Sequence, residues 1–489
     1  MDRRGFLRLA GIGAAALATG ACGSGETAPI STTTSGSAPP PPGSTGPPPP
    51  PDWAGLRGKV SLLLPSDPEF GNAWSPFNSA LSPAPPAALA RCGTPEQVQA
   101  CLDVVRRAKL PVAARSGGHS YAGYSAPAGG LVLDVSPMNA VRVRPDGTVS
   151  IGAGAKLADV YTALARAGRA LPAGSCPSVG IAGLTLGGGI GVLARKFGLT
   201  CDHLRSAQVV LPDGSLRTAS ADSEQELFWA LRGGGGGNLA VVTQFEFGTV
   251  PAPGLTVFSL RFPAGSGAAV LGAWQDWITT AAPELWSICH LLGGAPPVPV
   301  VAGCYVGGAA GLNPLLDRLI SASGARPGQR LVQPKGYLDA MRHFAGSGGG
   351  RREGFAAASR IMEHKITGLD QVVGQIQGRK MDLLFDGLGG AVGDVGVADT
   401  AFPHRKALAS VQIYAPAERA DAARQTSAVT DVQTALPGLV GKGSYVNYLD
   451  PAQRDWAQAY YGPNLARLRA AAARYDPDGV FRFAQGLTS

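Results

Sequence analysis

Residues 174–191 read Gly-Ser-Cys-Pro-Ser-Val-Gly-Ile-Ala-Gly-Leu-Thr-Leu-Gly-Gly-Gly-Ile-Gly, and this stretch governs the interpretation of the whole chain. So many small residues let a flat ligand lie directly against the backbone. Cys176 stands at the mouth of the stretch on an expected turn, a setting for a reactive thiol rather than for a packed one. Taken alone, the pattern slightly favours a structural glycine-rich loop with an incidental cysteine.

A second stretch precedes it, Arg115-Ser-Gly-Gly-His-Ser120. Two adjacent glycines with flanking hydroxyls let several backbone N–H groups converge on an anion such as a pyrophosphate. His119, beside that anion site, is positioned to meet a bound cofactor. A tight turn carrying a surface histidine is an equal alternative.

A third stretch, residues 228–243, runs from Phe-Trp-Ala-Leu-Arg through five glycines to Asn238-Leu-Ala-Val-Val-Thr. A helix that starts at Ser223, with Glu226 in its first turn, is expected to end at these glycines and lead into a strand over 239–247. Close approach of backbone to a ligand is again the implication. The three stretches in this order are stronger than any one of them.

Several familiar sites are excluded. No Gly-x-Gly-x-x-Gly follows an expected strand in this region, and no Walker loop is present. Residues 118–122, Gly-His-Ser-Tyr-Ala, miss the nucleophile-elbow pattern at the last position. The six histidines and seven cysteines show neither His-x-x-x-His nor Cys-x-x-Cys spacing, so no metal site is expected.

The chain has 489 residues, of which 45% are hydrophobic, enough for about two domains. Residues 53–250 alternate helix and strand signals, including a helix capped by Thr94 and a hairpin over 207–218, which indicates an α+β or α/β domain that holds the cofactor. Apolar runs over 256–262, 299–305 and 410–414 indicate a second domain over 251–440, a sheet backed by helices. Residues 441–489 form a C-terminal segment with two expected helices.

The N-terminus predicts export. Paired arginines precede a short apolar stretch within residues 1–22, the pattern of a twin-arginine signal, although a basic helix start is the alternative. The apolar run is shorter than the roughly 20 residues of a membrane span. Lipidation of Cys22 stays open, because Thr19 stands where such sites usually carry Leu. Residues 23–52, rich in Pro, Ser and Thr, are expected to be a disordered tether.

The formal net charge of +8 is spread over the chain without a Lys/Arg run, so no nucleic-acid partner is expected, and a membrane is expected only through a lipid on Cys22. An exported protein can keep disulfides. Cys92 with Cys101, and Cys289 with Cys304, are near enough in sequence to pair, and the pairing of Cys201 stays open. Sequence alone leaves this connectivity open.

The three glycine-rich stretches, in this order, resemble the FAD-binding domain of the berberine bridge enzyme–like branch of the vanillyl-alcohol oxidase (PCMH-type) family. Further matches are 401–405, 445–450 and 460–464, so the resemblance covers the chain from about residue 85 onward. It implies an α+β fold with a two-subdomain FAD-binding domain, an antiparallel sheet backed by helices in the substrate domain, and a C-terminal segment that returns to the FAD-binding domain.

The resemblance implies one FAD held by two covalent bonds. In relatives, the histidine that matches His119 bonds to the 8-methyl carbon of the isoalloxazine ring, and the cysteine that matches Cys176 bonds to C6. Two bonds would prevent cofactor loss outside the cell and favour hydride acceptance by the flavin. The other positions expected to contact the cofactor are Arg115, Ser116, Gly117, Gly118, Ser120, Gly174, Ser175, Val179, Gly180, Gly183, Asn238, Val241, Val242 and Asn447.

The catalytic base implied by the resemblance is Tyr448, with Tyr445 as its helper. A tyrosinate can remove a hydroxyl proton during hydride transfer if nearby positive charge or hydrogen bonds lower its pKa from about 10. Packing under the flavin is the alternative role for Tyr448. Two departures weaken any inference of the substrate from relatives. Many relatives carry His at the position of Leu184 and Tyr at the position of Ile190, so the pocket is expected to be more apolar here.

Three functions stay open from the sequence. The first is an oxidase that acts on an alcohol group of a sugar, oligosaccharide or secondary metabolite and reduces O2 to hydrogen peroxide, as Val179 favours in relatives. The second is a dehydrogenase that passes electrons to a quinone or another carrier. The third is a flavin-loaded binding protein without turnover, which the aliphatic Leu184 and Ile190 motivate.

Overall fold

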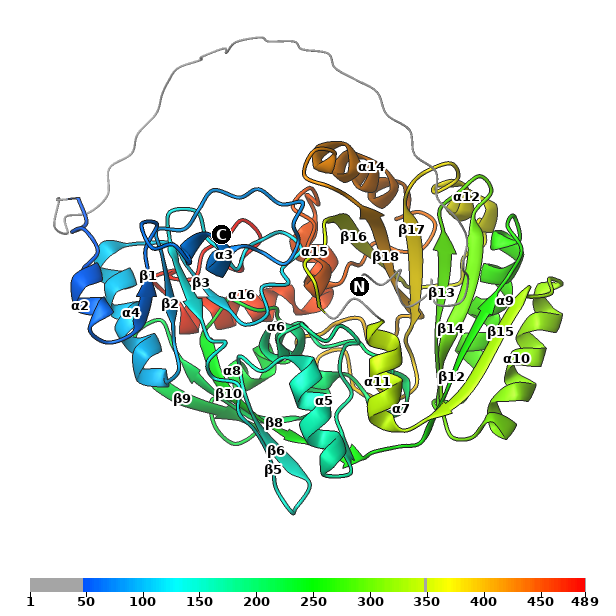
Figure 1. Ribbon diagram of the computed structural model, residues 1–489, viewed down its shortest axis with the longest axis horizontal. Helices are drawn as coiled ribbons and strands as arrows, with labels where there is room; N and C mark the ends of the chain where they lie inside the picture. Colours follow the sequence, from blue (N-terminus) through cyan, green and yellow to red (C-terminus); the bar gives the residue numbers. More distant parts are fainter. Residues whose placement is uncertain (1–46, 347–349, 489) are drawn as a thin grey trace, which may run out of the picture.

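The computed structural model describes residues 47–346 and 350–488 (Figure 1). A small mixed sheet stands first: β1 and β2 are antiparallel, while β4 is parallel to both β2 and β3. The helix α4 (Pro95–Ala108) connects β2 to β3. The strands, in their order across the sheet, are β1 (Ser61–Leu63), β2 (Ala88–Arg91), β4 (Leu131–Asp134) and β3 (Val112–Arg115), and the short helices beside them are α2 (Trp53–Arg57) and α3 (Phe70–Trp74).

A five-stranded antiparallel sheet follows, and its strands in spatial order are β5 (Val141–Val143), β6 (Thr148–Gly152), β10 (Val241–Gly248), β8 (Leu204–Val210) and β9 (Leu216–Ser220). A short ladder joins β7 (Arg169–Ala170) to β11 (Val250–Pro251). The helices between these strands are α5 (Leu157–Arg166), α6 (Ile181–Leu186), α7 (Ala194–Phe197), the 3-10 helix η1 (Thr200–His203) and α8 (Gln225–Ala230).

Local sequence explains most of these elements. Thr94 caps α4 by accepting a hydrogen bond from the Gln97 amide at 3.4 Å, as the sequence predicts. The predicted hairpin is β8–β9, whose turn includes Gly214 at φ +87°. The predicted helix start at Ser223 is wrong by two residues: α8 begins at Gln225, because Glu224 adopts a left-handed φ of 51°.

The second large unit is a seven-stranded sheet in which every neighbouring pair is antiparallel. In order across the sheet the strands are β15 (Gln329–Lys335), β12 (Leu255–Arg261), β14 (Val298–Val306), β13 (Leu285–Leu292), β17 (Asp382–Gly387), β18 (Ala409–Pro416) and β16 (Phe355–Met362). One face packs on α9 (Gly267–Thr280), α10 (Ala309–Ser323), α12 (Leu369–Gly374) and α14 (Ala422–Ala435), seen on the right and at the top of Figure 1. The remaining helices of this part are α11 (Tyr337–Ala345) and α13 (Ala391–Asp394). The α+β class and the antiparallel sheet backed by helices are therefore confirmed.

The opposite face of the seven-stranded sheet is buried against the first part of the chain. Trp286 and Ile288 of β13 belong to the core shared with that part, whereas Cys289 belongs to the core under the helices. Cys304 lies in the shared core, on the other face of the sheet from Cys289. The suggested Cys289–Cys304 pairing is therefore wrong, and both thiols are free.

The other suggested pair lies close together without a bond. The sulfur atoms of Cys92 and Cys101 are 3.8 Å apart, and both cysteines are free thiols. Each of these two side chains is fully buried.

The C-terminal segment lies against the first part of the chain. Arg467 forms an ion pair with Glu226 of α8 at 2.7 Å, and the Leu487 amide donates to the Asn238 side chain at 3.0 Å. Its elements are η2 (Val446–Tyr448), α15 (Trp456–Tyr461), η3 (Gly462–Asn464) and α16 (Leu465–Tyr475). In the described part of the chain, no helix is both long and apolar enough to cross a membrane. The predicted export signal, Cys22 and most of the tether lie outside the described residues.

Candidate functional site

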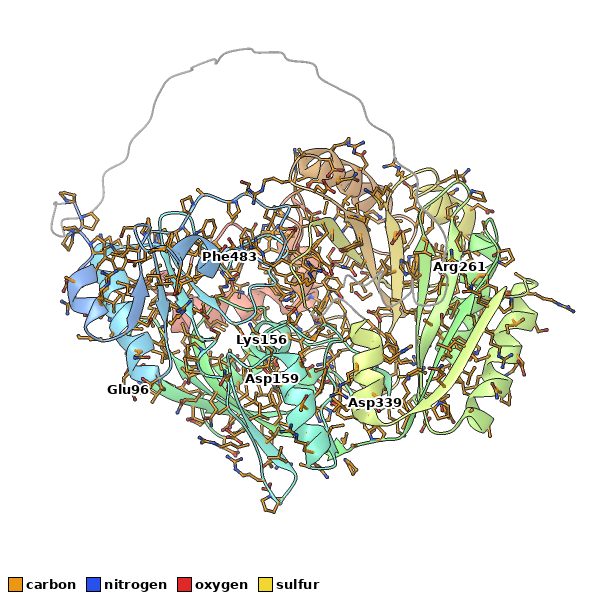
Figure 2. The ribbon with its side chains drawn as sticks, in the orientation of Figure 1. Glu96, Lys156, Asp159, Arg261, Asp339 and Phe483 are labelled. Atoms are coloured by element: carbon orange, nitrogen blue, oxygen red, sulfur yellow. The ribbon has the colours of Figure 1, made fainter. Side chains whose placement is uncertain are left out.

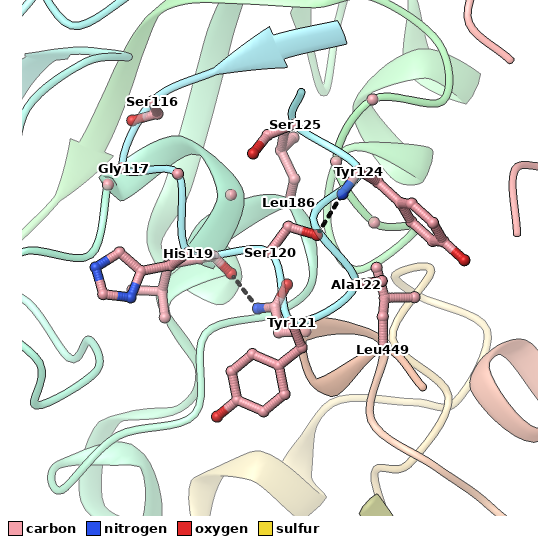
Figure 3. A pocket seen from close by; sticks show the side chains of 18 of the residues that line it. Ser116, Gly117, His119, Ser120, Tyr121, Ala122, Tyr124, Ser125, Leu186 and Leu449 are labelled. Atoms are coloured by element: carbon pink, nitrogen blue, oxygen red, sulfur yellow. Dashed lines mark hydrogen bonds between the residues drawn. The ribbon is translucent and has the colours of Figure 1, made fainter. Parts of the chain in front are cut away.

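A cavity of about 650 Å³ opens between the glycine-rich loops and the seven-stranded sheet. All three stretches singled out in the sequence border it, and so do residues of β16, β18 and the C-terminal segment. Figure 3 shows its edge along residues 116–125, where Ser116, His119 and Tyr121 follow one another. Its volume is in the range typical of small-molecule and cofactor sites.

The loop after β3 is held by backbone contact. A Cβ on Gly117 would lie 2.4 Å from the Gly180 nitrogen, so only glycine allows this approach. Ser116 donates from Oγ to the Ala153 carbonyl at 2.6 Å, and Gly118 has φ +69°. The loop that carries His119 and the stretch that carries Cys176 are thereby packed against each other.

The His119 ring is fixed on one face and one edge. Phe77 stacks on it with ring centroids 3.7 Å apart, and Nε2 lies 2.9 Å from the Ser178 hydroxyl. Burial, together with the charges of Lys156 and Arg115, lowers the pKa of His119 to about 3. Lys156 precedes α5 (Figure 2) and donates to the Ser116 carbonyl at 2.8 Å. The imidazole is therefore neutral at ordinary pH, with a lone pair available on one nitrogen.

Cys176 lies half-buried at the rim of the same cavity. Its sulfur is 3.6 Å from the Ser178 hydroxyl, so one side chain contacts both predicted attachment residues. Tyr161 of α5 supports the loop by donating to the Gly174 carbonyl. Nothing in the sequence pattern around Ser178 indicates this role.

Tyr445, which caps η2, and Tyr448, which lies within it, are held in different ways. The Tyr445 hydroxyl accepts hydrogen bonds from the amides of Gly189 and Ile190, at 3.0 and 3.3 Å, and from Asn447 Nδ2 at 2.9 Å. Burial raises the pKa of Tyr445, so this hydroxyl stays protonated. Tyr448 stacks on Tyr121, with ring centroids 5.1 Å apart and planes 12° apart, and both side chains border the cavity.

Aliphatic side chains surround this pair. Ile190 packs in one cluster with Tyr445 and Tyr448, and Leu184 accepts a hydrogen bond at its carbonyl from Asn447 Nδ2 at 3.0 Å. Both residues border the cavity. The side chains of these two residues give this part of the wall an aliphatic lining.

The sheet contributes residues that sequence reasoning missed. Gln412 of β18 donates from Nε2 to the Tyr121 hydroxyl at 2.6 Å, and Phe355 and Tyr414 border the cavity. The Tyr121 ring meets Phe355 edge-on at 4.9 Å. No motif surrounds Gln412, Phe355 or Tyr414. The only available signal was their alternation with core residues, which does not tell the two faces of a strand apart.

Most residues predicted to contact the cofactor border the cavity. Besides His119 and Cys176 these are Ser116, Gly117, Gly118, Ser120, Gly174, Ser175, Val179, Gly180, Gly183, Asn238, Val242 and Asn447.

Two predicted positions differ. Arg115 does not border the cavity and donates to the carbonyls of Trp74 and Ser75, the latter at 2.8 Å. Val241 is fully buried in the core, because strand alternation gives the cavity to its neighbour Val242.

Across residues 47–346 and 350–488, no three His, Cys, Asp or Glu side chains are grouped so as to hold a metal ion.

Two family models match the chain. One, described as a FAD binding domain, matches residues 86–220, and another, described as "Berberine and berberine like", matches residues 444–488. A curated chitooligosaccharide oxidase from Gibberella zeae is 31% identical over 463 residues, which cover 87% of this chain and 92% of that protein.

Solved structures give the same picture. The BBE-like 1 protein of Physcomitrella patens aligns with a TM-score of 0.83 at 28% identity, over 88% of this chain and 97% of that one. A glucooligosaccharide oxidase from Acremonium strictum, described with "6-s-cysteinyl, 8 alpha-N1-histidyl FAD", aligns with a TM-score of 0.80 at 27% identity, over 89% of this chain and 98% of that one.

Proposed function

Because the chain belongs to the berberine-like FAD-linked oxidoreductases, which act on CH–OH groups, we propose that it binds FAD through both His119 and Cys176 and oxidises a sugar or oligosaccharide. FAD is the cofactor of this family, and the cavity fits it. Gly183 has open space where a Cβ would stand, so a flat ring can approach its backbone. When bound, FAD supplies the acceptor for a hydride.

The observation that supports two covalent bonds is that both nucleophiles border one cavity and share one neighbour. His119 Nε2 is 2.9 Å and the Cys176 sulfur is 3.6 Å from the hydroxyl of Ser178. The neutral imidazole of His119 carries a lone pair that can bond to carbon, and the half-buried Cys176 presents its sulfur at the rim of the cavity. The related glucooligosaccharide oxidase is described with the same pair of linkages.

The substrate proposal rests on the opposite wall. Tyr121, Tyr448, Phe355 and Tyr414 present aromatic surface to the cavity, which suits the apolar face of a sugar ring. Tyr448 is proposed to take the hydroxyl proton as hydride leaves the same carbon. Tyr445 is its proposed helper, acting by fixing Gly189, Ile190 and Asn447 beside the reacting groups.

The electron acceptor is proposed to be O2, reduced to hydrogen peroxide. Val179 borders the cavity three residues after Cys176, where the family resemblance favours access of oxygen to the ring.

The protein is further proposed to be exported by the twin-arginine route, with Cys22 as the candidate lipid anchor.

One experiment tests the proposal. The purified full-length protein is precipitated with acid, and the visible spectrum of the pellet is compared among the parent, His119→Ala, Cys176→Ala and the double variant. Flavin should stay with the parent pellet and fall stepwise in the variants. The same samples are offered chito-, xylo- and gluco-oligosaccharides while peroxide is measured.

Peroxide formed at a rate proportional to enzyme supports the oxidase. Turnover only with a quinone dye overturns O2 as the acceptor and leaves sugar oxidation standing. If the parent protein releases all of its flavin into the acid supernatant, the proposal of covalent attachment is overturned. Absence of turnover with every sugar and acceptor overturns the catalytic proposal.

A further inference from the structure

Ser178 contacts both proposed attachment residues and is not one of the residues that line the cavity. Its hydroxyl oxygen is 2.9 Å from His119 Nε2 and 3.6 Å from the Cys176 sulfur. Ser178 does not border the cavity, whereas His119 and Cys176 do. The hydroxyl therefore contacts both nucleophiles without itself lining the cavity.

The backbone on both sides of Ser178 is anchored. The amide of Leu157 donates to the Val179 carbonyl at 3.0 Å, and the amide of Ala158 donates to the Pro177 carbonyl at 3.0 Å. Both donors belong to the first turn of α5, whose free N–H groups are thereby satisfied. These two bonds fix the position from which the Ser178 side chain extends.

A serine hydroxyl carries one proton, so its two contacts are linked. If Ser178 accepts a hydrogen bond from Nε2–H of the neutral imidazole, the lone pair of His119 is on Nδ1, and the hydroxyl proton is free to point at the Cys176 sulfur. If the hydroxyl instead donated to Nε2, the ring proton would be on Nδ1, and the sulfur would lose its donor. Only the first arrangement prepares both nucleophiles together.

We propose that Ser178 is the shared positioning residue for cofactor attachment, which fixes the His119 tautomer and supplies a hydrogen bond to the Cys176 sulfur. This inference rests on the proposed covalent FAD. In each attachment, a C–H bond of the ring system and the N–H or S–H bond of the protein are lost, and a C–N or C–S bond forms. The two protons and two electrons released pass to O2, giving one hydrogen peroxide for each bond.

The test isolates each bond. Ser178→Ala is placed in the Cys176→Ala background, where only His119 can attach, and in the His119→Ala background, where only Cys176 can. The readout is the ratio of acid-stable flavin to total bound flavin in full-length protein harvested at successive times, with the linkage site identified by peptide mass. Ser178→Thr keeps the hydroxyl, and Ser321→Ala on the exposed face of α10 is the handling control.

We expect the ratio to fall about tenfold in both backgrounds with Ala, consistent with the loss of a hydrogen bond, and to recover to within twofold with Thr. Total bound flavin should not change, which separates attachment from folding. An unchanged ratio with Ala, or a loss at one residue alone, overturns the shared role of Ser178. Failure of Thr to restore what Ala removes also overturns it. If the parent itself carries only dissociable flavin, the proposed covalent function falls, and this inference falls with it.

Discussion

The two sides of the cavity are built in different ways, one from closely packed backbone and the other from side chains. On the cofactor side, backbone meets backbone: a Cβ on Gly117 would lie 2.4 Å from the Gly180 nitrogen, and one on Gly191 would lie 1.8 Å from the Ala173 carbonyl oxygen. On the sheet side, Tyr414 lines the cavity from the regular strand β18, and Gln412 of the same strand holds the hydroxyl of the lining residue Tyr121. The cofactor side therefore accepts only glycine at these positions. The sheet side requires only that alternate residues of a strand face the cavity, and their type can vary.

This difference separates what is common to the family from what is particular to the chain. Glycine at a close backbone approach cannot be exchanged without moving the loop. A strand residue can be exchanged while the ladder of backbone hydrogen bonds stays intact. Cofactor binding should therefore fail sharply on the first side, and substrate preference should change gradually on the second.

The largest expected effect comes from Gly191→Ala. The added methyl would collide with backbone, and overpacking of this kind costs about 1–3 kcal/mol or more. We expect little soluble protein and little bound flavin, measured by expression yield and by the spectrum. Gly438→Ala, away from the cavity, is the matched variant, because nothing lies within 4 Å of its Cβ position. It should fold with normal thermal stability and bind flavin, and equal loss in both variants would contradict the comparison.

Tyr448→Phe should remove turnover while leaving cofactor attachment intact. Loss of a general base lowers kcat by roughly 10²- to 10⁴-fold, whereas the ring and its stacking on Tyr121 are kept. Steady-state peroxide formation and acid-stable flavin are measured on the same preparation. Tyr305→Phe, in the outer part of β14, serves as control. A Tyr448→Phe variant with unchanged kcat would refute the base.

Neighbouring residues of β18 sharpen the sheet side of the comparison. Gln412→Leu removes the hydrogen bond to the Tyr121 hydroxyl, a change worth about 0.5–1.5 kcal/mol, so kcat/KM should fall by up to about tenfold. Ile413→Val acts in the core under the helices and should lower the free energy of unfolding by about 0.5–1.5 kcal/mol without altering kcat/KM. Opposite outcomes for the two variants would reverse the assigned faces.

The smallest expected effect is that of acid on attachment through His119. An ordinary histidine, with a pKa near 6.5, is mostly protonated at pH 5. His119 has its pKa lowered to about 3, so it stays neutral there, and the rate of acid-stable flavin formation in Cys176→Ala should change less than twofold between pH 8 and pH 5. A steep loss with a midpoint near 6.5 would contradict this assignment.

The same shift has a stability counterpart with a definite sign. The unfolded chain takes up a proton at this histidine below about pH 6.5, while the folded chain does so only near pH 3. The folded state therefore loses stability as pH falls through that window. In chemical unfolding of the flavin-free protein, His119→Gln should reduce this slope between pH 6.5 and pH 4.

Sequence reasoning succeeded where local chemistry alone determines structure. The Thr94 cap, the hairpin over 207–218 and the glycine loops around His119 and Cys176 follow from residues near each other in the chain. It failed where geometry depends on register. Cys289 pairs with Val301 across the β13–β14 hairpin and Cys304 with Trp286, so the two cysteines point to opposite faces. Gln412 and Ser178 were missed because their partners, Tyr121 and His119, are distant in sequence.

The hydrogen bond from the Leu487 amide to Asn238 implies that the cavity closes late in the synthesis of the nascent chain. The two residues are 249 positions apart, and Phe483, Ala484 and Gln485 supply part of the cavity wall. When the ribosome has synthesised the glycine-rich loops, the C-terminal residues that complete the cavity wall have therefore not yet been made. The cofactor can be enclosed only after translation has reached residue 487, so shortening this end should affect flavin retention as directly as a change beside the ring.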